Sequence, residues 1–217
     1  MAEPLPPCPL SRRQRAAKRA VDVVVAVVGL ALTWWLILLA AAVATVETPR
    51  LGLFLQERVG RGGCRFRLCK IRTMHPQSEA AGSWTVAGDA RITRSGVLLR
   101  RFKLDELPQL ANVLAGHMSL VGPRPDVPGF ADELTGDDRV VLTVRPSVTR
   151  PATVYYRHEE ELLAAQDDPE RYNREVLFPA KVAMNRRYLE QYSLAADLRL
   201  LLATVGALPS RAAETPR

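Results

Sequence analysis

Two adjacent carboxylates lie between basic residues near the middle of the chain. Asp105 and Glu106 follow Arg100 and Arg101, and the segment Gly122-Pro123-Arg124-Pro125 comes shortly after them. A carboxylate can attack phosphorus to give an acyl phosphate. Guanidinium groups can hold phosphoryl oxygens in bidentate fashion while charge shifts on them. The pattern therefore indicates a site that handles phosphate groups.

The same acidic pair has a plain structural explanation. Acids are favoured in the first turn of a helix because they interact with its macrodipole. The segment Leu104-Asp105-Glu106-Leu107-Pro108-Gln109 is too short by itself to decide between that role and catalysis. The rest of the sequence has to decide.

The composition limits the classes of partner. With 217 residues the chain can form one domain and an appendage. The formal net charge of +7 fits nucleic acid, an anionic membrane surface or phosphorylated substrates. Aromatic residues make up only 6% and form no stacking surface with the basic residues, which argues against nucleic acid. Cys8, Cys64 and Cys69 are too scattered for a disulfide framework or a zinc site, so reduced cytosolic thiols are expected.

The elements that must position the acidic pair begin with an apolar segment. Residues 21–46 contain one charged residue, Asp22, and form about 26 residues of helix, roughly 39 Å long against a hydrocarbon core of about 30 Å. A soluble core helix is rarely apolar on every face. A cleavable signal peptide is the other alternative, because Ala42-Val43-Ala44 resembles a cleavage site, but the apolar run exceeds the usual length of about 7–15 residues. The segment therefore predicts a membrane-inserted helix.

The orientation of this segment stays open. Basic residues flank it on both sides, so the positive-inside rule gives no clear asymmetry. A hairpin-like helix that enters and leaves by one face fits these flanks, and so does a spanning helix. Trp34 and Trp35 lie in the middle of the run, and because tryptophan prefers the interface they favour a bent or shallow segment.

The other elements follow from local patterns. Residues 1–17 predict a disordered basic tail. Residues 53–56 and 65–71 predict two short strands joined by a glycine turn, and residues 92–102 and 106–114 predict two helices. A polar loop is expected at 78–88. Helical composition returns at 159–163, 169–192 and 194–208, with Ser193 as the N-cap of the last helix.

Taken together, these residues resemble a known family, the bacterial sugar transferases, which are small monotopic polyprenyl-phosphate phosphoglycosyl transferases. The match begins at Lys18 and thins after Pro125. Its blocks are Lys18-Arg19 with Asp22, Gln56-Glu57-Arg58-Val59-Gly60, Lys70-Ile71-Arg72-Thr73-Met74, Asp89-Ala90-Arg91-Ile92-Thr93-Arg94-Ser95-Gly96, Leu99-Arg100-Arg101, Leu104-Asp105-Glu106-Leu107-Pro108-Gln109-Leu110, Asn112-Val113-Leu114, Gly116 and Met118-Ser119-Leu120-Val121-Gly122-Pro123-Arg124-Pro125. Several ordered blocks are far more specific than any single one.

The resemblance implies an enzyme that transfers a phospho-sugar from a nucleotide diphosphate sugar, a UDP-sugar by expectation, to undecaprenyl phosphate. Asp105 would form a covalent aspartyl-phosphosugar intermediate and release UMP. Both substrates are polyanions, so Mg²⁺ and basic side chains are expected to offset their charge. Asp105 and Glu106 are the expected catalytic and metal-binding residues. The expected phosphate-binding residues are Arg100, Arg124, Arg72 and Lys70.

The chain departs from the family pattern at several positions. Thr33-Trp34 stands where the family has a proline break in the membrane helix, so the usual source of a kink is missing. Lys103 replaces a common serine, and His117 replaces an aspartate. The segment 145–150 lacks both glycines of the family motif, so the identity of the sugar cannot be transferred.

The predicted fold is mainly α with short β segments, an α/β arrangement without a Rossmann domain. A re-entrant membrane-inserted helix at 18–48 joins a compact interfacial catalytic domain at 49–210, followed by a tail at 211–217. The expected location is the cytoplasmic face of the bacterial inner membrane, where the enzyme would start a cell-surface glycan such as an exopolysaccharide. Membrane lipid is an expected partner, and a homodimer is one option for the assembly. The alternatives are a non-catalytic membrane scaffold of a polysaccharide assembly complex and an anionic-lipid-binding module.

Overall fold

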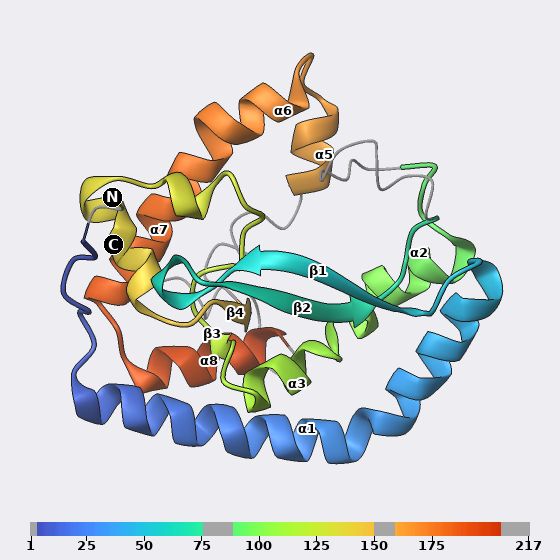
Figure 1. Ribbon diagram of the computed structural model, residues 1–217, viewed down its shortest axis with the longest axis horizontal. Helices are drawn as coiled ribbons and strands as arrows, with labels where there is room; N and C mark the ends of the chain where they lie inside the picture. Colours follow the sequence, from blue (N-terminus) through green and yellow to red (C-terminus); the bar gives the residue numbers. More distant parts are fainter. Residues whose placement is uncertain (1–3, 76–88, 150–158, 205–217) are drawn as a thin grey trace.

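The longest element is helix α1, which spans Arg12–Glu47 and forms the base of the molecule in Figure 1. This computed structural model describes residues 4–75, 89–149 and 159–204. It is mostly helical with short strands, as the sequence predicted. The predicted polar loop at 78–88 and the tail at 211–217 lie outside the described residues.

The other elements stand above α1 in Figure 1 and follow it along the chain. They are β1 (Leu53–Val59), η1 (Arg61–Gly63), β2 (Arg65–Ile71), α2 (Arg94–Arg101), η3 (Leu104–Glu106), α3 (Gln109–Leu114), β3 (Ser119–Val121), η4 (Ala131–Glu133), η5 (Gly136–Thr143), β4 (Ser147–Thr149), α5 (Glu159–Ala164), α6 (Pro169–Tyr172), the π-helical η6 (Asn173–Leu177), α7 (Phe178–Glu190) and α8 (Leu194–Thr204).

The first turn of α1 corrects the prediction that residues 1–17 form a disordered tail. The helix begins at Arg12 because Ser11 and Gln14 form a capping box. The Ser11 hydroxyl accepts the Gln14 N–H at 3.2 Å, and the Ser11 N–H donates to the Gln14 side chain at 2.8 Å. Leu10 is buried in the core. The proline-rich, basic composition of this segment suggested disorder. The local pattern of a serine followed three residues later by a glutamine indicates the start of the helix.

Helix α1 changes direction along its length, as Figure 1 shows, although it contains no proline. Its two ends bury different residues, Asp22 and Ala26 on one side of the bend and Ala40 and Ala44 on the other. Between them, the Thr33 hydroxyl donates to the Gly29 carbonyl at 2.6 Å. A hydroxyl that bonds back by one turn bends helices, so Thr33 supplies a source of curvature where the family pattern has proline.

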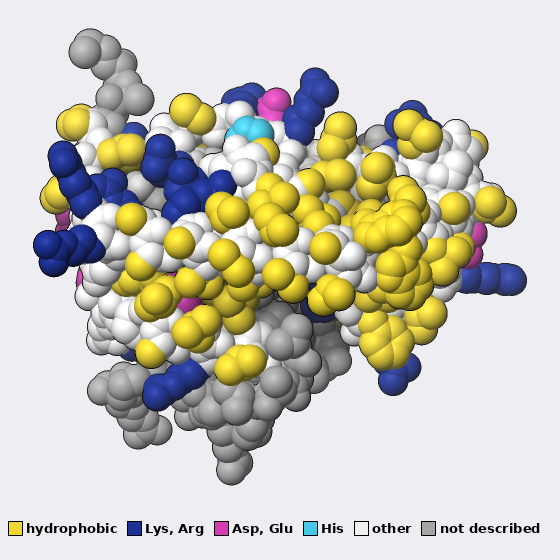
Figure 2. All heavy atoms as spheres, turned by 90° about the horizontal axis from the view of Figure 1, so that it is seen from below, with side chains coloured by type: hydrophobic (Ala, Val, Ile, Leu, Met, Phe, Trp, Pro, Cys, Tyr) yellow, Lys and Arg dark blue, Asp and Glu magenta, His cyan; other side chains and the backbone are white. Residues whose placement is uncertain are grey.

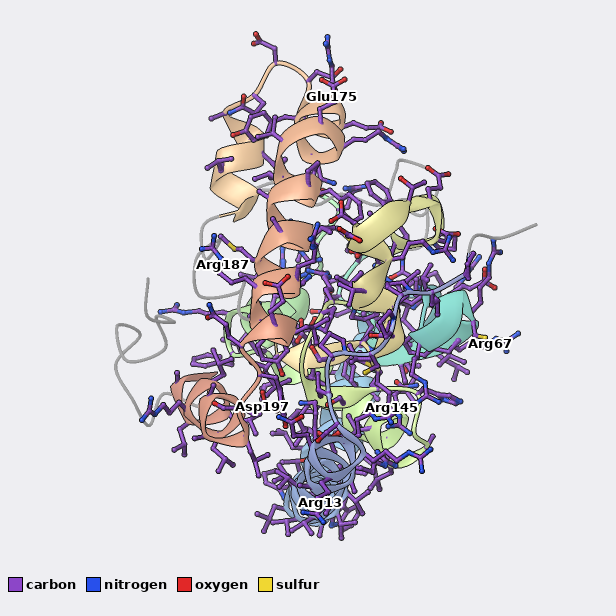
Figure 3. The ribbon with its side chains drawn as sticks, turned by 90° about the vertical axis from the view of Figure 1, so that its left-hand side faces the viewer. Arg13, Arg67, Arg145, Glu175, Arg187 and Asp197 are labelled. Atoms are coloured by element: carbon purple, nitrogen blue, oxygen red, sulfur yellow. The ribbon has the colours of Figure 1, made fainter. Side chains whose placement is uncertain are left out.

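Three polar side chains near the start of α1 attach it to the domain above. Lys18 pairs with Asp197 of α8 at 2.5 Å, and Figure 3 shows Asp197 between α8 and α1. Arg19 donates to the carbonyls of Val113 and Leu114 at the end of α3, at 2.7 and 3.0 Å. The Asp22 carboxylate accepts the Leu120 N–H at 2.9 Å. Lys18, Arg19 and Asp22 therefore attach α1 to three separate elements, α8, α3 and β3.

The predicted hairpin is confirmed. β1 and β2 pair antiparallel from Leu53 opposite Ile71 to Val59 opposite Arg65. The turn between them requires glycine because Gly62 has a φ of 76°. Phe54 and Lys70 lie opposite each other on the partly buried face of the hairpin.

A second strand pair was not predicted. β3 and β4 run parallel, with Ser119 opposite Ser147 and Val121 opposite Thr149. Each strand has three residues, and the parallel partners are far apart in the sequence, so neither carries a local strand pattern. The pair fixes the loop after β3, because the Ser147 N–H donates to the Pro123 carbonyl at 2.7 Å.

The helical predictions are confirmed for the described residues with one correction, and residues 205–208 of the last predicted helix lie outside them. α2 is the helix predicted at 92–102, and the Ser193 hydroxyl caps α8 by accepting the Ala196 N–H at 3.2 Å. The helix predicted at 106–114 begins only at Gln109, and Glu106 belongs to the separate 3₁₀ turn η3. The physical reason is Lys103, whose left-handed backbone (φ 57°) reverses the chain and starts a tight turn before α3.

The junction between α1 and β1 gives a stability prediction. A Cβ at Gly52 would lie 1.9 Å from the Ala41 carbonyl oxygen of α1. Gly52→Ala is therefore expected to destabilise the protein by about 3 kcal/mol or more, the upper end of the usual cost of overpacking. For a chain of this size that corresponds to a melting temperature lower by roughly 6–12 °C. Val46→Ala, at a side chain that is 88% exposed, is the control. Equal melting of wild type and Gly52→Ala would contradict this close packing.

Candidate active site

The acidic pair lies in η3, between the end of α2 and the start of α3. The Lys103 N–H donates to the Arg100 carbonyl at 3.1 Å, and the Glu106 N–H donates to the Lys103 carbonyl at 3.3 Å. This turn buries Asp105, which is 8% exposed, while Glu106 is half-buried. Tight backbone turns are a common way to hold a reactive side chain.

Burial decides the electrostatics of Asp105. It raises the pKa of the carboxyl group to about 6, and the neighbouring Glu106 carboxylate adds to the shift. Arg100, Lys70 and Lys103 oppose it. The Oδ1 atom is buried and has no hydrogen bond within the described part of the chain. Such an orphaned oxygen costs free energy unless a substrate or cation meets it.

Lys70 marks the basic side of the site. Burial lowers the pKa of its ammonium group to about 8, and repulsion from Arg58, Arg124 and Arg100 lowers it further, while Asp105 raises it. These interactions gather cations from β1, α2 and the loop after β3 around the Lys70 ammonium group of β2, which itself acts on the Asp105 carboxylate. Positive charge gathered this way suits an anion such as a phosphate.

The predicted phosphate-binding residues differ in their burial and in their contacts. Arg100 donates from Nε to the Thr73 hydroxyl at 3.2 Å. Arg124 is exposed and has no hydrogen bond or ion pair with the residues that the structure describes, so its guanidinium can meet a ligand. Arg72 is buried, with its guanidinium 4.9 Å from the Phe54 ring centroid and an Nε bond to the Leu51 carbonyl at 3.1 Å. It lies beside Lys70, which contacts the same ring at 5.2 Å.

Arg58 belongs to this group although it was not among the predicted site residues. Its Nη1 donates to the Pro125 carbonyl at 3.1 Å and its Nη2 to the Gln56 side chain at 2.7 Å. The backbone bond from Val59 to the Asp126 carbonyl, at 2.9 Å, ties the same strand to the arginine-containing loop. The Gln56-Glu57-Arg58 block could have indicated this role. Alternate residues of a strand share one face, which places Arg58 on the same face of β1 as Gln56.

Asp105 and Glu106 could supply some of the ligands of a magnesium ion. The described residues contain no group of three His, Cys, Asp or Glu side chains that could hold a metal ion. Mg²⁺ usually needs only one or two protein carboxylates, because waters and substrate phosphates complete its octahedron. The orphaned Oδ1 of Asp105 and the adjacent Glu106 provide that number.

Comparisons with known proteins agree on one family. The model of the bacterial sugar transferase family matches residues 13–211. The chain is 37% identical over 192 residues to the UDP-glucose:undecaprenyl-phosphate glucose-1-phosphate transferase of Caulobacter vibrioides, covering 88% of this chain and 69% of that protein. It is 34% identical over 189 residues to the UDP-N-acetylgalactosamine-undecaprenyl-phosphate N-acetylgalactosaminephosphotransferase of Aeromonas hydrophila, covering 87% of this chain but only 42% of that protein.

A third relative is shorter. A putative undecaprenyl-phosphate N-acetylgalactosaminyl 1-phosphate transferase of Bacillus subtilis is 42% identical over 126 residues, which is 58% of this chain and 70% of that protein. The region that the family model matches, residues 13–211, contains the hairpin, the acidic turn, Arg100 and Arg124. The chain therefore belongs to the bacterial sugar transferase family.

Proposed function

We propose that this enzyme transfers a sugar 1-phosphate from a UDP-sugar to undecaprenyl phosphate through a covalent intermediate on Asp105. The observation that supports this most is the buried Asp105 carboxylate, with an unpartnered oxygen among the described residues, in the field of Arg100, Lys70 and Lys103. A scaffold or lipid-binding module would have no use for an acid held at that position.

In the first step an Asp105 oxygen attacks the phosphorus that carries the sugar. A carboxylate–phosphorus bond forms, the bridging oxygen–phosphorus bond breaks, and the nucleoside monophosphate leaves with the bond's electron pair. Attack of one anion on another is slow unless the phosphoryl charge is offset. Lys70, Arg100 and Arg124 would offset that charge, and Arg58 would hold the loop that carries Arg124.

In the second step a phosphate oxygen of the polyprenyl phosphate attacks the same phosphorus. A new oxygen–phosphorus bond forms, the bond to Asp105 breaks, and the carboxylate returns to its starting state. The product is a polyprenyl diphosphate that carries the sugar. Each step exchanges one oxygen–phosphorus bond for another, so no net proton transfer to the protein is needed.

Asp105 and Glu106 would also hold a Mg²⁺ ion. When bound, the ion supplies charge neutralisation to the phosphate oxygens. Glu106 stands at the following position of the same turn and raises the Asp105 pKa by its charge. A cation beside both acids would relieve this repulsion and favour the ionised nucleophile.

We further propose that α1 inserts into the cytoplasmic face of the membrane. It is the one described helix long and apolar enough to cross a bilayer, and only 11% of its most apolar window is buried. Figure 2 shows apolar side chains over this face and basic side chains at one end of it. Exposed valines and leucines with Trp34 and Trp35 at 58% and 55% exposure suit a lipid environment. The bend in α1 favours re-entry over spanning.

The pH dependence follows from two shifted groups. Asp105 attacks as a carboxylate whose pKa is about 6 without a bound cation, and Mg²⁺ would lower it, so kcat/KM for the donor is expected to fall on the acid side at or below about pH 6. Lys70 binds phosphate as an ammonium with a pKa of about 8, so kcat/KM is expected to fall again as the pH rises through about 8. Lys70→Arg keeps its charge at higher pH and is expected to move the alkaline limb upward. An alkaline limb that does not move removes Lys70 from the site.

The reaction is tested by nucleoside monophosphate release. Detergent-solubilised protein is incubated with Mg²⁺, undecaprenyl phosphate and each member of a panel of UDP-sugars. UMP release with one sugar, together with a sugar-bearing polyprenyl diphosphate, is the expected result and identifies the donor. Folded protein that releases nothing with any donor would overturn the proposal and favour the scaffold reading.

A further inference from the structure

The last residue of α1, Glu47, reaches the helix that leads to the active site. Its two carboxylate oxygens lie 3.1 and 3.2 Å from the Ser95 backbone nitrogen, and the Ser95 hydroxyl donates to one of them at 2.6 Å. Ser95 is in the first turn of α2. The hydroxyl bond is the main cause that lowers the pKa of Glu47, so this carboxylate is ionised at neutral pH. A negative charge at a helix N-terminus is favoured by the macrodipole.

Helix α2 carries this contact to the site. The Thr93 hydroxyl caps α2 by accepting the Gly96 N–H at 3.0 Å, and the Thr93 N–H donates to the Thr73 carbonyl at 3.0 Å. At the other end of α2, Arg100 bonds to the Thr73 hydroxyl, and the turn with Asp105 follows. The helix has only eight residues, so a shift of its start is transmitted to Arg100.

An apolar cluster supports the same connection. Ala40 and Ala44 of α1 pack with Ile71 and Leu99, and Leu104 contacts this cluster. Ile71 is next to Lys70, Leu99 is next to Arg100, and Leu104 is next to Asp105. The C-terminal part of α1 thus packs against residues that are adjacent in sequence to Lys70, Arg100 and Asp105.

We propose that Glu47 is a positioning residue for phospho-sugar transfer, which fixes α2 against the end of the membrane helix and thereby sets Arg100 and Asp105. This inference rests on the proposed function. It means that the end of α1 is part of the catalytic framework as well as the membrane attachment. The bend in α1 determines where Glu47 lies, so insertion of α1 and the geometry of the site are linked.

Removal of the carboxylate leaves the Ser95 N–H and hydroxyl without their acceptor, and the start of α2 loosens. Displacement by about 1 Å at a reacting centre can lower a rate by about a hundredfold. Glu47→Ala is therefore expected to lower kcat by about ten- to a hundredfold, with the donor KM changed by less than about threefold. Glu47→Gln retains one oxygen that can accept the Ser95 hydroxyl and is expected to recover much of the loss.

The test is a double-mutant cycle on nucleoside monophosphate release by the full chain in detergent, with Glu47→Ala, Ser95→Ala and the double variant. If Glu47 acts through Ser95, the two effects on kcat are expected to be less than additive. Val46→Ala, at the exposed neighbouring position, is the matched control and is expected to keep the wild-type kcat. If Glu47→Ala fails to fold, Glu47→Gln and Ser95→Ala carry the comparison.

The outcomes separate the two proposals. Wild-type kcat in Glu47→Ala, with or without a lower melting temperature, overturns the positioning role and leaves the transfer reaction standing if Asp105→Asn is inactive. Fully additive effects also overturn it. A wild-type enzyme that is inactive with every donor overturns the proposed function itself, and the positioning role falls with it.

Discussion

Asp105→Asn is expected to abolish phospho-sugar transfer while the protein keeps its fold and membrane association. An amide oxygen is a poor nucleophile, so the carboxylate–phosphorus bond cannot form. Loss of a nucleophile commonly costs a factor of about 10⁴–10⁶ in kcat, and turnover here is expected to fall by at least about a thousandfold. The fold is expected to tolerate the change, because burial already disfavours the charge on Asp105.

The measurement is UMP release together with mass spectrometry of the protein. Wild-type enzyme mixed with donor and no acceptor is expected to gain the mass of one phospho-sugar on the peptide that contains Asp105, and Asp105→Asn is expected to gain none. Asp137→Asn makes the same chemical change at a side chain that is 88% exposed, so it is the matched control. Normal turnover in Asp105→Asn would remove the nucleophile assignment, and labelling at another residue would relocate it.

Much of the site could be predicted because its signals are local. Asp105 is next to another acid and follows a pair of arginines in the sequence. The hairpin follows from a glycine turn between two short extended segments. Even the N-cap of α8 at Ser193 was readable. Features of this kind depend on residues a few positions apart, which sequence patterns record.

What could not be predicted depends on contacts between distant segments. β3 and β4 pair across a long loop, and no pattern in three residues announces a parallel partner. Arg58 joins the site because its strand lies against the loop after β3. Lys103 separates Glu106 from α3 by adopting a left-handed backbone, a conformation that lysine rarely takes.

The role of α1 shows the same division. Its length and apolar composition were evident, whereas its bend occurs without proline and its end contacts α2 through Glu47. A helix that only anchored the domain would need no such contact. The packing of Ala40 and Ala44 with residues next to the candidate site argues that the proposed membrane anchor and the proposed catalytic framework are one structural unit.

Arg124→Ala is expected to lower kcat/KM for the donor by at least about tenfold, equivalent to about 1.4 kcal/mol of transition-state stabilisation. The buried prolines on either side, Pro123 and Pro125, fix the backbone that presents this arginine, while its side chain is exposed. Its charge lowers the pKa of Lys70, so the two cations lie within each other's field, as binding of one anion by both would require. No hydrogen bond to another described residue holds the guanidinium, so truncation is expected to leave stability nearly unchanged.

The comparison with Arg124→Lys separates charge from geometry. Lysine keeps the positive charge but lacks the planar fork that binds two phosphate oxygens at once, so its activity is expected to lie between those of wild type and Arg124→Ala. Arg171→Ala, at a side chain that is 71% exposed and pairs with Glu175, is the matched control and is expected to be silent. Equal kcat/KM in wild type and Arg124→Ala, measured with the same donor and Mg²⁺ concentration, would place the phosphate elsewhere in the basic group, with Lys70 and Arg100 as the remaining contacts.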